Sequence, residues 1–317
     1  MQASALPKDS KTTMNSRPTL SVIVVFHNMA REVPLTLFTL SAEYQRGVGS
    51  GDYEVIVLDA GSVAPLEENF VKSFGENFRL VRSPAAPSPV AAVNWATTLV
   101  RGEAIALCID GARMLSPGIL RHMLDAFKIW NDPLVATLAW HLGPKIQNES
   151  MLEGYNQSVE DRLLESVDWR ADGYELFRIS SLAGSSKYGW FGPLGESNCL
   201  AVRKETWARL GGLHEEFVSP GGGLVNLDFY REACGQLDPL VILLGEGTFH
   251  QFHGGVATNV PWKDHPGANF SGEYERIRAK TFAVEEKAAT YLGRVPPQAL
   301  GFLEFSATKA REARGNP

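Results

Sequence analysis

Polar side chains close three apolar stretches in the first third of this sequence. They are His27 with Asn28, then Asp59, and then Asp110. Imidazole and carboxylate groups bind cations and the hydroxyls of polar ligands. In open sheets with alternating strands and helices, ligands bind outside the carboxyl ends of the strands. If the three stretches are strands of one parallel sheet, these side chains form a single polar binding site.

A second group of side chains could assist the first. His250 and His253 follow a later apolar run with a His-x-x-His spacing that suits two ligands of one metal ion, although packing or surface positions explain them equally well. Arg113 follows Asp110 by three residues, and an arginine fork can hydrogen-bond a diphosphate.

The elements that must position these residues alternate along the chain. Apolar, β-branched runs predict strands at residues 21–27, 54–58, 78–82, 104–109, 134–142, 196–202 and 240–244. Helices are predicted at 33–45, 65–74, 89–101, 116–130, 149–168, 204–210 and 228–234, with a long loop at 178–193. The near-continuous apolar strands are typical of a sheet buried on both faces. We therefore predict a mixed α/β fold with a mostly parallel sheet.

Composition excludes several classes of protein. The formal net charge of -6 over 317 residues gives no general basic footprint, so we expect no nucleic-acid partner. The three cysteines form no CxxC pair, which favours a reducing compartment. No apolar stretch is long enough for a membrane span. Residues 1–17 are polar and predict a disordered leader without a signal peptide. We expect a cytoplasmic protein, with peripheral attachment to a membrane left open.

Four segments together resemble the GT-A fold glycosyltransferases, especially the inverting enzymes of family 2. The segments are Ser21–Asn28, Val55–Ser62, the stretch from Asn94 through Gly102 to Asp110, and Trp207–Phe217 with its Gly-Gly pair. The resemblance spans roughly residues 18–253. It implies a glycosyltransferase domain at 18–262, with a nucleotide-binding half at about 18–143 and an acceptor-binding half at about 144–262. A C-terminal helical extension is expected at 263–317.

The resemblance implies a hexosyl or related transfer from a nucleotide-diphosphate sugar, with UDP the expected nucleotide. The acceptor would be a glycan, a lipid-linked molecule or a peptide, in the synthesis of a polysaccharide or glycoconjugate. The donor would contact residues at the strand ends and nearby: His27, Asn28, Asp59, Asn94, Asp110 and Arg113.

The metal site departs from the family pattern. Asp110 stands at the first position of the family's Asp-x-Asp signature, but Ala112 replaces the second aspartate. Three outcomes are open: Mn²⁺ or Mg²⁺ held by Asp110 with His250 or His253, charge neutralisation by Arg113 without a metal, or lost activity. A weakly held metal is the favoured expectation.

Inversion requires a carboxylate that removes the proton of the attacking hydroxyl. In the family this base follows the Gly-Gly segment, where Asp228 is the matching carboxylate and Asn226 occupies one place of the usual acidic pair. Glu196 is the competing base. The glycine run 221–223 suits a mobile loop over the donor, and Trp190 with Phe191 could stack on a sugar ring.

Each residue also has a structural explanation, and the function has rivals. Asp59 could cap a turn, and Asp110 or Asp228 could lie at the N-terminus of a helix. A dehydrogenase or nucleotidyltransferase needs a glycine-rich turn after the first strand, which residues 27–31 lack. The stronger rival is a degenerate, glycosyltransferase-like binding or scaffolding protein.

Overall fold

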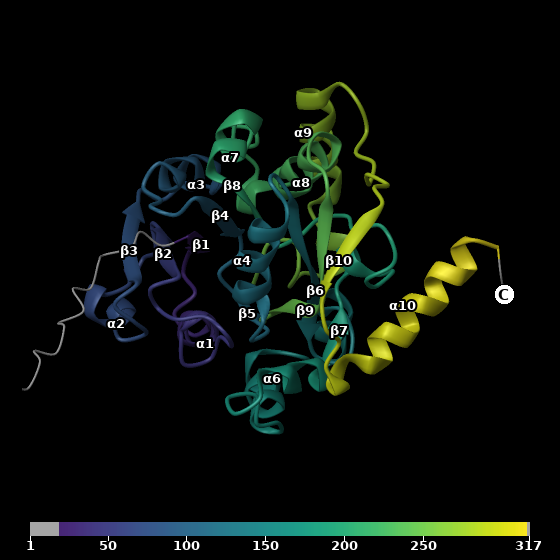
Figure 1. Ribbon diagram of the computed structural model, residues 1–317, viewed down its shortest axis with the longest axis horizontal. Helices are drawn as coiled ribbons and strands as arrows, with labels where there is room; N and C mark the ends of the chain where they lie inside the picture. The colour runs from purple at the N-terminus through teal and green to yellow at the C-terminus, as the bar shows by residue number, and fades with distance from the viewer. Residues whose placement is uncertain (1–18, 316–317) are drawn as a thin grey trace, which may run out of the picture.

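The computed structural model describes residues 19–315, so the predicted leader at 1–17 lies outside the described residues. A mixed sheet forms the centre of the molecule, and helices lie on both of its faces (Figure 1). The strands are β1 Leu20–Phe26, β2 Tyr53–Ala60, β3 Phe78–Ser83, β4 Ala104–Cys108, β5 Arg113–Leu115, β6 Leu134–Leu142, β7 Ser180–Leu182, β8 Cys199–Arg203, β9 Leu240–His250 and β10 Ala289–Gly293. The α-helices are α1 Glu32–Leu40, α2 Glu68–Lys72, α3 Val90–Thr97, α4 Ile119–Ile129, α5 Gln147–Ser150, α6 Gln157–Glu165, α7 Lys204–Leu210, α8 Val225–Gln236, α9 Gly267–Arg278 and α10 Leu300–Ala313.

The sheet order is β10-β9-β6-β8-β4-β1-β2-β3, with β5 beside β9 and β7 beside β6. In the first half, β4, β1, β2 and β3 are neighbours and run parallel, as predicted. Phe26 pairs with Asp59, and Val24 pairs with Cys108. This register brings the carboxyl ends of three strands to one edge of the sheet, next to His27 and Asp110.

Alternation of side chains along β1 explains why both faces of the sheet are covered. Val22, Val24 and Phe26 pack with residues of α1 and α4 on one face. Ile23 and Val25 pack with residues of α3, α7 and α8 on the other. Because successive side chains of a strand point to opposite faces, a continuous apolar run requires a helix layer on each side.

The second half of the sheet is mixed. β8 runs antiparallel between β4 and β6, whereas β9 runs parallel to β6. The short strand β5 pairs antiparallel with the end of β9, and its Arg113 lies opposite His250. On the other side of β9, His141 of β6 also pairs with His250. The sheet register therefore inserts His250 between Arg113 and His141.

Several elements differ from the sequence-based expectation. β9 continues to His250 instead of ending near residue 244, and β5, β7 and β10 were not predicted. Glycines mark the change in β9: Gly245 has a φ of 79°, and a Cβ at Gly247 would collide with the Trp140 ring. A strand that bends at glycines lacks the apolar pattern that predicts strands, because its glycines are selected for close packing.

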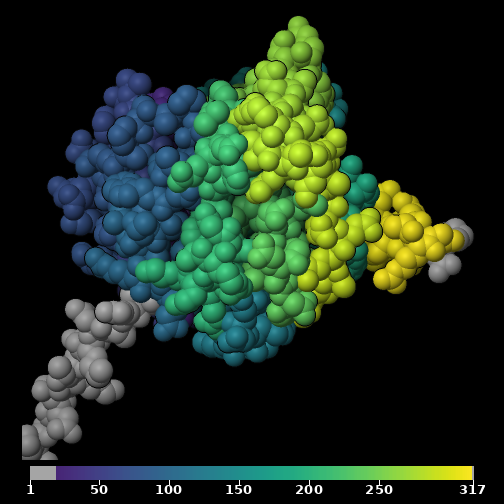
Figure 2. Space-filling view, turned by 90° about the horizontal axis from the view of Figure 1, so that it is seen from above, coloured from purple at the N-terminus to yellow at the C-terminus, as the bar shows by residue number. Residues whose placement is uncertain are grey.

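The C-terminal segment adds a strand as well as helices. β10 pairs in parallel with β9 at the edge of the sheet, between α9 and α10. α10 stands out from the body of the molecule (Figures 1 and 2), and its first turns pack inward, with the Phe302 ring 5.5 Å from that of Trp140. Trp190 is buried at 5.5 Å from the same ring, so it is not available to stack on a sugar. Within residues 19–315, no helix has the length and apolar character needed to cross a membrane.

Candidate functional site

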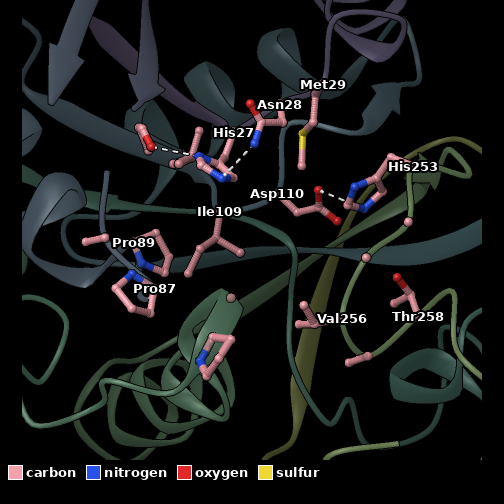
Figure 3. Close-up of a pocket in the computed structure, with 18 residues that line it drawn as sticks. His27, Asn28, Met29, Pro87, Pro89, Ile109, Asp110, His253, Val256 and Thr258 are labelled. Atoms are coloured by element: carbon pink, nitrogen blue, oxygen red, sulfur yellow. Dashed lines mark hydrogen bonds and ion pairs between the residues drawn. The ribbon is translucent and has the colours of Figure 1, made fainter. Parts of the chain in front are cut away.

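A cavity of about 580 Å³ opens at the carboxyl ends of β1, β2 and β4 (Figure 3). Its walls include the residues at or just after the ends of these strands: Val25, His27, Asn28, Met29, Ala60, Ile109 and Asp110. Its rim consists of three loops: Ala86, Pro87 and Pro89 after β3; Pro220 and Gly221 before α8; and residues 253–258 after β9. The cavity thus lies where the strand ends predicted a polar site, and its lining is largely apolar.

His27 and Asn28 line the cavity, and both use their polar atoms within the protein. His27 Nδ1 lies 2.9 Å from the carbonyl oxygen of Ala60, and its Nε2 lies 3.0 Å from Asn28 Nδ2 (Figure 3). Asn28 Oδ1 accepts a hydrogen bond from the backbone N–H of Val63, and the N–H of Asn28 donates to Ser62 Oγ. These contacts fasten the end of β1 to the loop after β2. The positive φ of Asn28, 53°, belongs to this sharp turn.

Asp59 and Asn94 lie outside the cavity lining. The two carboxylate oxygens of buried Asp59 accept hydrogen bonds from the N–H groups of Ser62 and Leu66, so Asp59 shapes the loop after β2. Asn94 bonds both the N–H and the carbonyl oxygen of Leu213. The structure thus places both residues in supporting positions around the predicted donor site.

Asp110, His250 and His253 form a cluster of side chains with metal-ligand atoms. Asp110 Oδ2 lies 3.0 Å from His250 Nε2, and Asp110 Oδ1 lies 3.8 Å from His253 Nε2. The two Nε2 atoms are 3.2 Å apart. Asp110 and His253 face each other at the cavity wall (Figure 3), and His250 is fully buried behind them.

Burial and neighbouring charges shift the pKa values of Asp110 and His250. Burial alone would raise the pKa of Asp110, but His250, His253 and Arg113 outweigh it and hold that pKa well below its usual range. Burial lowers the pKa of His250 to about 4, against the opposing influence of Asp110. At neutral pH the cluster therefore contains an ionised carboxylate and at least one neutral imidazole.

This donor set fits a divalent metal ion. One ligand atom from each of the three residues lies within 4.8 Å of the others. Neutral imidazole nitrogens and a carboxylate oxygen that converge at this spacing match the ligands of Zn²⁺, Mn²⁺ and related ions. The residues present thus make a chemically suitable site, although Ala112 offers no second carboxylate.

Arg113 lies behind Asp110 and outside the cavity lining. Its Nε is 3.3 Å from Asp110 Oδ2, and its side chain is 6% exposed. Among the described residues, Nε and Nη1 of Arg113 have no partner in hydrogen-bond geometry. The guanidinium therefore supplies a buried positive charge beside Asp110.

The two candidate bases have different surroundings. Asp228, near the start of α8, is buried and forms a two-pronged ion pair with Arg278, with N–O distances of 2.7 and 2.5 Å. Glu196 precedes β8 and accepts a hydrogen bond of 2.5 Å from Asn226. Burial raises the pKa of Glu196, and the charges of Arg113 and Asp110 also influence it. Neither carboxylate belongs to the cavity lining.

Two glycine-rich loops meet over the cavity. Gly221, Gly222 and Gly223 all have positive φ values, between 55° and 88°. The N–H of Gly221 donates to the carbonyl oxygen of Pro87, and a Cβ at Gly221 would lie 3.1 Å from Val256 of the opposite loop. The predicted glycine loop therefore reaches the rim, where it is tied to the loop after β3.

Sequence reasoning missed three residues that hydrogen-bond to His250 or to the backbone just after it. Gln147 contacts His250, Asn259 holds the loop after His253, and Glu160 accepts hydrogen bonds from the N–H of Phe252. All three are buried polar residues. Their only signal in the sequence is a polar residue near a strand or helix end, a pattern too common to single them out.

No protein-family model matches the sequence, and no curated protein shows significant similarity to it. Solved structures are similar in fold. The crystal structure of S. aureus TarS 1–349 has a TM-score of 0.50 and 13% identity, covering 74% of this chain and 60% of that one. The same fragment in complex with UDP-GlcNAc has a TM-score of 0.50 and 14% identity, covering 75% and 59%. This chain thus spans less than two thirds of the TarS chains that it matches.

At this level of identity the likeness concerns architecture. The predicted mixed α/β fold, with helices on both faces of a central sheet, is confirmed, and the TarS structures share this architecture.

Proposed function

We propose that this protein is a glycosyltransferase that binds a nucleotide-diphosphate sugar, with UDP as the nucleotide, in the cavity at the ends of β1, β2 and β4. The observation that carries the proposal is the position of the Asp110–His250–His253 cluster on the wall of that cavity. A fold shared with TarS, which has been crystallised with UDP-GlcNAc, supports the same reading. The acceptor is a hydroxyl of a glycan, a lipid-linked molecule or a peptide.

We propose that Asp110, His250 and His253 hold a divalent metal ion. When bound, such an ion neutralises negative charge on the diphosphate leaving group. Two imidazoles and one carboxylate favour Mn²⁺, Co²⁺ or Zn²⁺ over Mg²⁺, which prefers oxygen ligands. Arg113 adds a fixed positive charge beside Asp110 and keeps that carboxylate ionised.

For the proton transfer we propose Glu196 ahead of Asp228. A base works best when its pKa lies near the working pH, and the raised pKa of Glu196 moves it in that direction. Both carboxylate oxygens of Asp228 are engaged by the Arg278 guanidinium, which leaves them less accessible to an acceptor hydroxyl. An inverting transfer would use such a carboxylate on the acceptor side. We assign the acceptor to the half at about 144–262, which contains Glu196 and the glycine loop.

We also propose a cytoplasmic protein. All three cysteines, Cys108, Cys199 and Cys234, are buried as free thiols, which agrees with a reducing compartment.

A thermal-shift screen tests the donor site. UDP, GDP, dTDP and CMP are each added with and without Mn²⁺ or Mg²⁺, because a ligand of the native state raises the melting temperature by mass action. We expect stabilisation by UDP that Mn²⁺ enhances more than Mg²⁺. The enhancement is lost in Asp110→Asn and kept in Asp125→Asn, a matched change on the exposed side of α4. A folded protein that responds to no nucleotide would refute the proposal.

A second candidate is a degenerate binding protein. The engagement of Asp59 with the loop after β2 and the pairing of Asp228 with Arg278 favour it. Transfer or hydrolysis assays with a nucleotide-sugar panel separate the two. Binding of UDP without turnover of any donor would support the degenerate protein.

A further inference from the structure

A chain of buried amides runs behind the cluster and ends at His250. It consists of Asn259, in the loop after β9, and Gln147, the first residue of α5. Both side chains are buried, with exposed fractions of 7% and 0%. Neither residue touches the cavity, so neither belongs to the donor site proposed above.

The orientation of the Asn259 amide is fixed by the backbone. Its Oδ1 accepts hydrogen bonds from three successive N–H groups, those of His253, Gly254 and Gly255, at 3.0–3.1 Å. An amide nitrogen carries only donors and could not take this position. The Nδ2 group of Asn259 must therefore point the other way, where it donates to Gln147 Oε1 at 2.8 Å.

Contacts at both ends of the Gln147 side-chain amide fix its orientation. Its Oε1 accepts from Asn259, and its Nε2 faces three acceptors: the carbonyl oxygens of His250 and Leu142, at 3.0 and 3.4 Å, and Glu160 Oε2 at 3.4 Å. A flipped amide would place an oxygen against three acceptors and a nitrogen against a donor. Oε1 is consequently the atom that lies 2.8 Å from His250 Nδ1.

An oxygen acceptor at this distance requires a proton on His250 Nδ1. In the neutral imidazole the lone pair is then on Nε2, the atom 3.0 Å from Asp110 Oδ2 and 3.2 Å from His253 Nε2. We propose that Asn259 and Gln147 are positioning residues that lock His250 in the Nδ1–H tautomer, so that Nε2 is ready to bind a metal ion. The inference rests on the proposed metal site, but the tautomer itself does not depend on a metal.

The physical benefit is preorganisation. A histidine that ligates through Nε2 donates its other N–H to an oxygen, and removing that partner weakens metal binding by about 10- to 100-fold. Here the oxygen belongs to the neutral amide of Gln147, which accepts a hydrogen bond from Asn259. The direction of Asn259 is in turn set by three backbone N–H groups of the loop that carries His253. The same loop therefore positions one histidine ligand directly and sets the tautomer of the other.

Three variants separate this role from simple packing. Asn259→Asp keeps an oxygen for the three loop N–H groups but replaces the donor to Gln147 with a second acceptor. Gln147→Met keeps the volume and removes the oxygen. Gln147→Glu, as the protonated acid, keeps an acceptor for His250 Nδ1–H and replaces the Nε2 donor with an O–H, so it serves as the matched control. Burial against the carbonyl oxygens of His250 and Leu142 favours that protonated form.

The first readout is the tautomer of His250 in the metal-free full chain, from long-range ¹H–¹⁵N correlations at pH 7.5. We expect Nδ1–H in the wild type and in Gln147→Glu, and a shift towards Nε2–H in Asn259→Asp. The inference would be overturned by Nε2–H or a doubly protonated ring in the wild type. This result is independent of nucleotide binding and turnover, so it stands or falls separately from the proposed function.

The second readout is Co²⁺ affinity from the visible absorption of the bound ion. We expect Kd to rise about 10- to 100-fold in Asn259→Asp and Gln147→Met, and to stay within about 3-fold of the wild type in Gln147→Glu. Circular dichroism confirms that each variant is folded. Unchanged Co²⁺ affinity in both folded disrupting variants would contradict the role. If Asn259→Asp changes the His250 tautomer but neither the wild type nor any variant binds Co²⁺, the positioning role of the two amides is supported and the metal site is refuted.

Discussion

Two walls of the cavity use polar residues in opposite ways. On the wall formed by the ends of β1 and β2, the polar atoms of His27 and Asn28 bond to backbone groups or to one another. Asp59, outside the lining, holds the loop after β2. On the wall formed by Asp110 and His253, with His250 behind it, one ligand atom from each of the three side chains lies within 4.8 Å of the others. The first wall fixes the shape of the cavity, whereas the second carries the ligand atoms of the proposed metal site.

The largest difference between the walls should appear when Asp110 is removed. Asp110→Ala is expected to weaken Co²⁺ or Mn²⁺ binding by about 1,000-fold, since a complete set of protein ligands contributes about 10–16 kcal/mol to a structural metal site and each ligand carries a share. Calorimetric titration of the metal measures the change. Asp125→Ala, on the surface of α4, should bind metal as the wild type does, and an equal loss there would point to general destabilisation.

The second wall also depends on a buried carboxylate. Glu160 accepts the N–H of Phe252 and pairs with Arg31, and burial raises the pKa of Glu160 to about 7. Because the folded-state pKa exceeds the unfolded value of about 4.5, the unfolded state loses its proton first, and stability declines as pH rises from about 4.5 through 7.

Glu160→Gln removes this titration. As the pH rises from 5 to 8, the free energy of unfolding of the variant should increase by up to about 3 kcal/mol relative to that of the wild type. This figure follows from ~1.4 kcal/mol per pKa unit. Urea unfolding at several pH values measures the difference. Parallel stability curves for the two proteins would show that Glu160 has an ordinary pKa.

Two histidine variants, one from each wall, test the difference between the walls directly. His253→Ala should weaken metal binding by about 100-fold, because a ligand is lost. His27→Ala should leave metal affinity unchanged and cost about 1 kcal/mol of stability through its contact with the Ala60 carbonyl oxygen. Co²⁺ titration and chemical unfolding of both variants give the result. Equal effects on metal affinity would erase the distinction between the walls.

The smallest effect is expected at Asp59. Asp59→Asn keeps one acceptor for the loop and loses the other, so about 1 kcal/mol of stability should disappear while metal affinity is unchanged. Thermal unfolding measures the stability. If UDP affinity instead drops more than 10-fold, Asp59 contacts the donor as the family resemblance implied.

Much of the fold could be predicted from local patterns. The β-branched runs at β1, β2 and β4 specify strands with both faces buried, and the strand 134–142 and the helix 204–210 occur with the predicted bounds. β5 and the end of β9 escaped prediction because three-residue strands and glycine bends leave no periodic signal. Whether His27 and Asp110 contact a donor, and whether Asp110 and His253 bind a metal ion, stays a prediction, whereas the place of all three in the cavity lining is observed.

The positions of the polar strand ends follow from the sequence, because a continuous apolar run stops where its buried strand ends. Tertiary contacts decide which of these polar side chains are used within the protein and which converge in the cluster. The pairing of β5 with β9 places His250 beside Arg113 and Asp110, more than a hundred residues away in sequence. The amide of Asn259 is oriented by N–H groups of the loop after β9, and the amide of Gln147 by Asn259 and by carbonyl oxygens at the ends of β6 and β9. No local sequence pattern encodes these contacts.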